Sequence, residues 1–240
     1  MSRVLILLAH PQIENSRVAR ALVAAAHSVA HSVAHAASAD ASPAPPQIVL
    51  RDLYALYPDY LIDVEAEQAA LAGVTLLVWL HPIHWYSMPP LMKLWLDEVL
   101  TLGWAYGPGG QALQGVDLWL AASTGGPEAS YRPTGYNRYF FDAFLPPYEQ
   151  TAALTGMRFL PPWLLHGAHQ AETPAWPPML RCLGSACAAT PTGPSWPTCP
   201  RARNARCRAS RALLTDGRRH PPRQAGQQAD ARSFEPSPEP

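Results

Sequence analysis

Short hydrophobic runs rich in branched side chains alternate along the chain with stretches of helical periodicity. Residues 74–80 form one such run, which a His-Pro pair ends. A run of this length without polar alternation is typical of a strand buried on both faces of a parallel sheet. After Pro89-Pro90, hydrophobic residues return at helical spacing, which predicts a helix that begins near residue 91.

The same alternation continues to residue 165 and predicts an α/β fold, a flavodoxin-like doubly wound sheet of five parallel strands. Ser16 is a suitable N-cap for the first helix, whose buried face includes Val18 and Leu22. Glu65 and Glu67 are expected to face outward from a helix over 64–71, and residues 54–63 to form a loop. The predicted strands are residues 4–9, 47–53, 74–80, 117–122 and a split fifth strand at 157–160 and 163–165, and a last helix is expected over about 138–154, delayed by Pro146-Pro147.

Three loops follow predicted strands one, three and four, and the carboxyl ends of neighbouring strands share one edge of such a sheet. The first loop, residues 10–16, leads into a helix N-terminus, which favours phosphate. No GxGxxG or Walker sequence is present, so a dinucleotide or triphosphate is not indicated. The second loop, residues 81–87, is crowded with His, Trp and Tyr and is typical of the wall of a site for a flat ring. The third loop is residues 123–126, Ser-Thr-Gly-Gly.

Composition divides the chain near Gln170. Residues 1–170 hold eight Lys and Arg against thirteen Asp and Glu, a net −5, whereas residues 171–240 hold ten against five, a net +5. The second part contains all four cysteines and has no Ile, Val, Lys or Tyr. Such a composition buries too little hydrophobic surface to fold, so we expect a disordered tail, and we hypothesise that it is a frameshifted translation. The predicted domain is therefore residues 1–170.

Residues 27–46 form a low-complexity insertion inside this domain, with histidines repeated at every fourth position. A metal site is one interpretation of these histidines, but a solvated surface loop is the favoured one. No hydrophobic stretch approaches the roughly 20 residues of a membrane span, and the N-terminal run is too short for a signal peptide. We therefore expect a cytoplasmic protein. The arginines of the tail form no organised patch, so a nucleic-acid partner is not expected.

Eight short segments carry a family resemblance. In order and spacing they resemble the flavodoxin-like NAD(P)H:quinone oxidoreductases, with a closer likeness to the ancillary subunits of glutathione-regulated potassium-efflux systems. The likeness runs from Met1 to about Gln170. The segments are residues 9–11 (Ala-His-Pro); 53–54 with 57–59 (Leu-Tyr, Tyr-Pro-Asp); 62–63 with 67–68 (Ile-Asp, Glu-Gln); 81–82 with 85–87 (His-Pro, Trp-Tyr-Ser); 91 with 93–97 (Leu, Lys-Leu-Trp-Leu-Asp); 103–107 (Gly-Trp-Ala-Tyr-Gly); 124–126 (Thr-Gly-Gly); and 160–162 (Leu-Pro-Pro).

The resemblance implies noncovalent FMN, NAD(P)H as hydride donor and quinones as acceptors. It also implies a homodimer whose site lies at the two-fold interface, where the loop of Trp104 and Tyr106 would reach the partner's flavin; core packing is the alternative role of these two rings. The carried-over phosphate and ribityl contacts are His10, Ser16, Arg17, Val18 and Ala19, and the carried-over ring contacts are Ile83, His84, Trp85, Tyr86, Ser123, Thr124, Gly125 and Gly126.

Two departures from the family pattern bear on turnover. Tyr131 lies where related quinone reductases place a tyrosine that assists proton movement, but their companion histidine is Asn137 here. Many members also carry Asn at the position of Ala19. An alternative function is therefore a regulatory subunit that activates a potassium-efflux antiporter at the inner face of the cell membrane, with little turnover of its own. A flavin-free α/β domain is a third interpretation.

Overall fold

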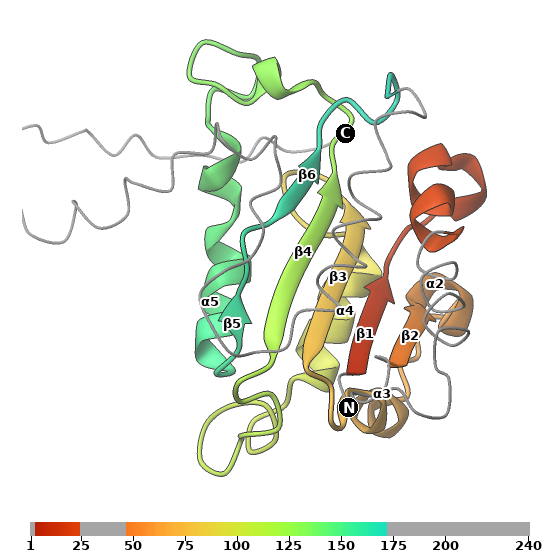
Figure 1. The fold of residues 1–240 in the computed structure, drawn as a ribbon, viewed down its shortest axis with the longest axis vertical. Coiled ribbons are helices and arrows are strands. Elements are labelled where there is room, and N and C mark those ends of the chain that lie inside the picture. The colour runs from red at the N-terminus through yellow and green to blue at the C-terminus, as the bar shows by residue number, and fades with distance from the viewer. Residues whose placement is uncertain (1–2, 25–46, 172–240) are drawn as a thin grey trace, which may run out of the picture. The chain divides into compact units, whose positions relative to one another are not determined.

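The sheet is built by parallel pairing of the predicted hydrophobic strands. The computed structural model describes residues 3–24 and 47–171, and its strand order is β2-β1-β3-β4-β5, with β6 also paired to β4 (Figure 1). This arrangement confirms the predicted flavodoxin-like fold and the split fifth strand. The strands are β1 Arg3–Leu8, β2 Gln47–Asp52, β3 Leu76–Pro82, β4 Asp117–Ser123, β5 Arg158–Phe159 and β6 Trp163–Leu165.

Helices connect these strands, and two of them differ from the prediction. Residues 53–56, predicted as the end of the second strand and the start of a loop, form a helix, and the side chain of Asp52 caps it by accepting a hydrogen bond from the Ala55 N–H at 3.3 Å. The last helix begins only at Pro146, where proline suits the first turn, and a 3-10 turn precedes it. The helices are residues 17–24, α2 Leu53–Leu56, α3 Val64–Leu71, α4 Pro90–Val99 and α5 Pro146–Leu154, with 3-10 turns η1 Ile13–Asn15, η2 Glu128–Ser130 and η3 Phe141–Phe144.

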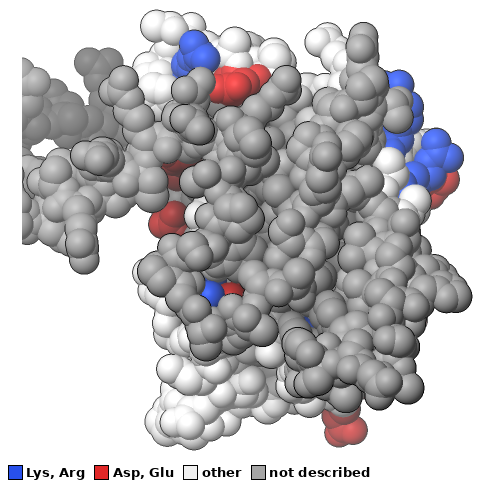
Figure 2. All heavy atoms as spheres, in the orientation of Figure 1, with Lys and Arg blue, Asp and Glu red and all other residues white. Residues whose placement is uncertain are grey.

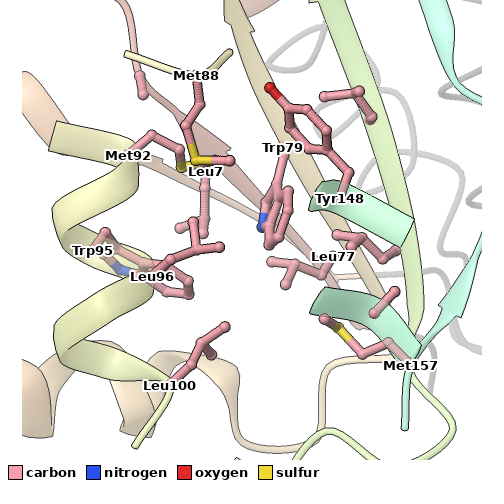
Figure 3. Packing of buried hydrophobic residues seen from close by; sticks show 14 of the residues in the cluster. Leu7, Leu77, Trp79, Met88, Met92, Trp95, Leu96, Leu100, Tyr148 and Met157 are labelled. Carbon is pink, nitrogen blue, oxygen red and sulfur yellow. The ribbon is translucent and has the colours of Figure 1, made fainter. Parts of the chain in front are cut away.

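Hydrophobic side chains pack on both faces of the sheet. On one face, α3, α4 and α5 cover strand residues such as Leu7, Leu77 and Trp79. Figure 3 shows the side chains of α4 directed toward Trp79, whose ring lies 6.1 Å from that of Tyr148 on α5. On the other face, the helical residues 17–24 contribute Val18 and Leu22 to a second cluster with alternate residues of β1, β3 and β4. Burial on both faces explains why these strands read as continuous hydrophobic runs.

Glu67 is the clearest error of the sequence prediction. We expected it to face outward, but its side chain is fully buried beneath α4. The carboxylate accepts hydrogen bonds from Arg51 on β2 at 2.5 and 2.8 Å, from the Tyr57 hydroxyl at 2.5 Å and from the Trp95 indole at 2.9 Å. Four elements thus meet at one charge, which is stable there because donors surround it.

Two predicted segments fall outside the described residues: the whole of the 27–46 insertion and the tail beyond Ala171. Within the described ranges, none of the helices is both long and apolar enough to cross a lipid bilayer.

Candidate flavin site

The loops after β1, β3 and β4 meet at one edge of the sheet. The Ala9 N–H donates to the Leu80 carbonyl at 3.0 Å, and the Ile83 N–H donates to the Ser123 carbonyl at 2.7 Å, so backbone bonds join the three loops. A shallow pocket opens where they meet, on the face covered by the helical residues 17–24. Its walls are Leu8, His10, Val18, Ala19, Leu22, Leu80, His81, Pro82 and Ser123.

The first loop presents a helix N-terminus beside the pocket. The Ser16 hydroxyl accepts a hydrogen bond from the Ala19 N–H at 3.0 Å, as an N-cap does, and η1 holds the loop before it. The N–H groups of Arg17 and Val18 stand in the first turn, where helix geometry leaves them without intrahelical partners. In Figure 2, Lys and Arg atoms gather at the right edge of this face, in the region of the helical residues 17–24. This end of the helix therefore favours an anion.

His10 lies at the pocket wall, where its Nδ1 accepts a hydrogen bond from the Gln12 N–H at 3.2 Å. Burial lowers the pKa of His10, and the neighbouring His84 lowers it further, while Glu14 and Asp52 oppose the shift. His10 is therefore mainly neutral at pH 7 and can act as a hydrogen-bond partner of a polar group in the pocket.

The second loop is a tight turn with two aromatic residues at its tip. His84 and Ser87 exchange backbone hydrogen bonds at 2.9 and 3.0 Å, and the two residues between them, Trp85 and Tyr86, have φ values of 47° and 65°. Such left-handed backbone costs free energy for bulky side chains and tends to persist at functional positions. Trp85 is 93 % exposed, whereas Tyr86 stacks on Phe144 with ring centroids 5.1 Å apart.

Replacing Trp85 by asparagine is expected to stabilise the flavin-free protein by about 1 kcal/mol, because asparagine adopts the left-handed conformation more readily than tryptophan. The exposed indole has little packing to lose. Denaturant unfolding of the two proteins measures the difference. Tyr136→Asn is the matched control, since Tyr136 is 89 % exposed and is not among the residues with positive φ. Equal changes in both variants would show that the turn stores no strain.

The third loop brings backbone close to the chain that follows β6. The Thr124 N–H donates to the Leu165 carbonyl, the Ala168 N–H to the Thr124 carbonyl and the Gly167 N–H to the Gly126 carbonyl, each at 2.9 Å. A Cβ atom on Gly125 would lie 3.2 Å from Nε2 of His169, so a side chain there would press against that ring. Glycine at this position therefore lets the third loop lie close to the His169 ring.

Tyr131 lies buried next to this loop, among the rings of Phe141, Phe144 and His166 at centroid distances of 5.3, 6.1 and 5.2 Å. Burial raises the pKa of the Tyr131 hydroxyl, and the nearby Thr124 side chain lowers it in part. The side-chain oxygen of Asn137 accepts a hydrogen bond from the Tyr86 hydroxyl at 3.3 Å.

Three histidines of this region were not singled out as site residues from the sequence. His81 is completely buried, and burial lowers its pKa to about 4. His166 and His169 follow β6 and contact the third loop. Arg17 also donates a hydrogen bond to the His169 carbonyl at 3.2 Å, which ties the first loop to the same segment. The signal available in the sequence was the position of residues 166–169 at the carboxyl end of the last predicted strand.

The aromatic residues of the glycine-rich loop, Trp104 and Tyr106, are partly buried and pack against the larger hydrophobic core cluster, which includes residues of α4. This contact agrees with the core-packing interpretation. The contact of Trp104 and Tyr106 with the flavin of a second protomer stays a prediction.

Comparison with known proteins identifies the family. A family model described as flavodoxin-like fold matches residues 2–177. The chain belongs to the flavodoxin-like family. The glutathione-regulated potassium-efflux system ancillary protein KefF from Citrobacter koseri is 40 % identical to it over 163 residues, which are 68 % of this chain and 82 % of that protein. The flavodoxin-like chain is thus also related to the KefF ancillary proteins.

Two solved structures share both fold and sequence with this flavodoxin-like chain. General stress protein 14 from Treponema denticola, solved in complex with FMN, is 34 % identical with a TM-score of 0.58, and the match covers 77 % of this chain and 99 % of that chain. A structure described as a thermophilic tryptophan halogenase from Streptomycin violaceusniger is 38 % identical with a TM-score of 0.59, over 77 % and 95 % of the two chains. The names of these two proteins do not point to one shared activity. The two structures therefore support the family assignment and do not indicate a single reaction.

The described residues fit FMN as a cofactor. The helix N-terminus suits its phosphate, the pocket beside it is lined mainly by hydrophobic residues, and Gly125 is exposed and has no side chain to hold a flavin ring away from its backbone. These three features come from separate parts of the chain and lie around the one sheet edge.

Proposed function

We propose that this protein is an FMN-dependent NAD(P)H:quinone oxidoreductase that works as a homodimer. The observation that carries the proposal is the meeting of three loops, each with a different property: an anion-binding helix end, a strained aromatic turn and an open glycine backbone. A molecule with a phosphate at one end and a planar ring at the other would use all three. The FMN complex of the 34 % identical relative supports this assignment.

The first loop would hold the phosphate and the ribityl chain. The N–H groups at the start of the helix and the guanidinium of Arg17 would neutralise a dianion, because the helix dipole and a nearby cation both favour negative charge. His10 would bond a ribityl or phosphate oxygen from the pocket wall. Val18 and Ala19 line the floor, and Ser16 fixes the first turn through its bond to the Ala19 N–H.

The second and third loops would hold the ring. Ile83, His84, Trp85 and Tyr86 would form one wall, and the backbone of residues 123–126 would place N–H groups at the polar edge of the ring. When bound, FMN would accept a hydride from NAD(P)H and return two electrons to an acceptor. Tyr131 would supply a hydrogen-bond donor beside that acceptor, since its hydroxyl keeps its proton when burial raises its pKa.

Replacing Ser16 by alanine is expected to weaken FMN binding about fivefold. Loss of the cap costs about 1 kcal/mol and loosens the first turn that would hold the phosphate. Quenching of flavin fluorescence on titration measures the affinity. Thr151→Ala is the control, since the Thr151 hydroxyl donates to a carbonyl within α5, away from the three loops. An unchanged affinity in Ser16→Ala would argue against this loop as the phosphate site.

A second candidate function is regulation of a membrane antiporter, and the 40 % identity to a KefF ancillary protein favours it. In that role the flavin-loaded protein would dock on the cytoplasmic face of a potassium-efflux antiporter. Oxidation of NADPH or NADH in the presence of a small quinone separates the two functions. Turnover supports the oxidoreductase, whereas a protein that binds FMN but shows no turnover would retain only the regulatory role.

A further inference from the structure

The turn that follows β6 lies against two of the three loops of the candidate site. Residues 166–170 form this turn, with Gly167 at a φ of 69°, a conformation that glycine adopts without strain. The N–H groups of Gly167 and Ala168 donate to two carbonyls of the third loop, each at 2.9 Å. The turn is therefore fixed to the third loop through its backbone.

The same turn holds Arg17, which stands at the start of the helix in the first loop. The guanidinium of Arg17 donates to the His169 carbonyl at 3.2 Å. A carbonyl carries no net charge, so this bond directs the guanidinium without neutralising it. Within the described residues, three other arginines form ion pairs with carboxylates and Arg17 does not. The positive charge of Arg17 therefore remains available for an anion at the helix N-terminus.

The imidazole of His169 borders the third loop at Gly125. A Cβ atom on Gly125 would lie 3.2 Å from Nε2 and 3.3 Å from Cδ2 of His169, so this edge of the ring faces the glycine. In the part of the chain that the structure describes, the N–H groups of Gly125 and Gly126 donate no hydrogen bond. Gly125 and His169 are both exposed, so a planar ligand can reach these N–H groups and the imidazole together.

We propose that residues 166–170 form a fourth wall of the flavin site, in which His169 positions Arg17 for the phosphate and contacts the ring beside Gly125. The inference rests on the proposed FMN binding. Because the His169 carbonyl already directs the guanidinium, phosphate binding costs less side-chain freedom than it would with an untethered arginine. The imidazole adds a planar contact at the ring end. One turn thus serves both ends of a ligand that carries a phosphate and a planar ring.

Titration with FMN and with riboflavin separates the two contacts, because riboflavin has the same ring and ribityl chain but no phosphate. Arg17→Gln is expected to weaken FMN binding about tenfold and to leave riboflavin binding unchanged. His169→Ala keeps the carbonyl that holds Arg17 and removes the imidazole. It is therefore expected to weaken the binding of both ligands by the same factor, about threefold. Quenching of flavin fluorescence measures these affinities without turnover.

Gly167→Ala tests the turn as a whole. Alanine is strained at a φ of 69°, so the turn is expected to shift and FMN binding to weaken about fivefold. Gly73→Ala is the matched control, since Gly73 has a φ of 70° and open space where a Cβ atom would lie. Gly73 precedes β3, at the amino ends of the strands and away from the three loops. Both substitutions are expected to lower the stability of the protein, but only Gly167→Ala its affinity for FMN.

The outcomes separate failure of the fourth wall from failure of the proposed function. A folded wild-type protein that binds neither FMN nor riboflavin contradicts the flavin assignment, and the fourth wall with it. If the wild-type protein binds FMN, an unchanged or higher affinity in Arg17→Gln or His169→Ala overturns the fourth wall alone. Equal losses of affinity in Gly167→Ala and Gly73→Ala also overturn it, because they would reflect a general loss of stability.

Discussion

Replacing Glu67 by alanine is expected to lower the free energy of unfolding by about 3–5 kcal/mol. The substitution leaves the Arg51 guanidinium, which is largely covered, without its carboxylate partner. It also removes the acceptor of the Tyr57 hydroxyl and of the buried Trp95 indole N–H. Each donor then loses a hydrogen bond that water cannot readily replace. Urea unfolding followed by tryptophan fluorescence measures the change.

Asp97→Ala provides the matched control for Glu67. Asp97 pairs with Lys93 one helical turn away, and both side chains are more than half exposed. An exposed pair of this kind stabilises a protein by about 0.5 kcal/mol or less. Equal destabilisation by the two substitutions would contradict a stabilising role of the buried Glu67 carboxylate, because Glu67 and Asp97 differ mainly in burial.

Acidification from pH 7 to pH 4 is expected to remove about 3 kcal/mol of stability through His81 alone. Burial lowers the pKa of His81 from 6.5 to about 4. Between these two values the unfolded chain binds one proton more than the folded protein, so stability falls as the pH falls through this window. Above pH 6.5 both states hold a neutral imidazole, and the effect vanishes.

His81→Phe isolates this contribution. Phenylalanine keeps a planar ring against Tyr148, whose centroid lies 5.8 Å from that of His81, but it does not titrate. Unfolding free energies at pH 7.0 and pH 4.5 for both proteins give the difference. The variant is expected to lose markedly less stability on acidification, with a smaller loss remaining from His10 and His166, whose pKa values are lowered in the same direction. Parallel losses in the two proteins would exclude a neutral buried His81.

The sheet was predictable because its strands obey local rules. β1 is hydrophobic from Val4 to Leu8 and β3 from Leu76 to Leu80, and α3 follows a clear cap at Asp63, whose side chain accepts a hydrogen bond from the Ala66 N–H. These signals lie within a few residues of the elements that they define. The α-helix that was missed between residues 47 and 171, α2, is a single turn, and a proline two residues after it is typical of a loop.

Glu67 could not be placed from the sequence, because its partners come from three other elements. Helical periodicity treats a glutamate as an outward residue, and nothing close to it in sequence indicates that Arg51 and Trp95 will surround it. A buried charge becomes predictable only once the tertiary contacts are known.

The candidate site was likewise predictable where its features are local in sequence, and unpredictable where they depend on tertiary contacts. Position after a strand and a glycine pair were enough to propose the three loops, since these are local features of the chain. The family pattern places a companion histidine of Tyr131 at a fixed distance in sequence, and that position holds Asn137 here. The histidine that approaches Tyr131 lies 42 residues after Thr124, on the segment following β6. Sequence spacing could not reveal this contact, because a separate strand delivers it.

FMN titration of the purified protein tests the central claim most directly. We expect the protein to bind one FMN per chain, with a visible absorbance band at about 450 nm that stays with the protein on gel filtration. We expect weaker FMN binding in Ser16→Ala and Trp85→Asn. A folded protein that retains no flavin after incubation with excess FMN would contradict the claim that these three loops form a flavin site.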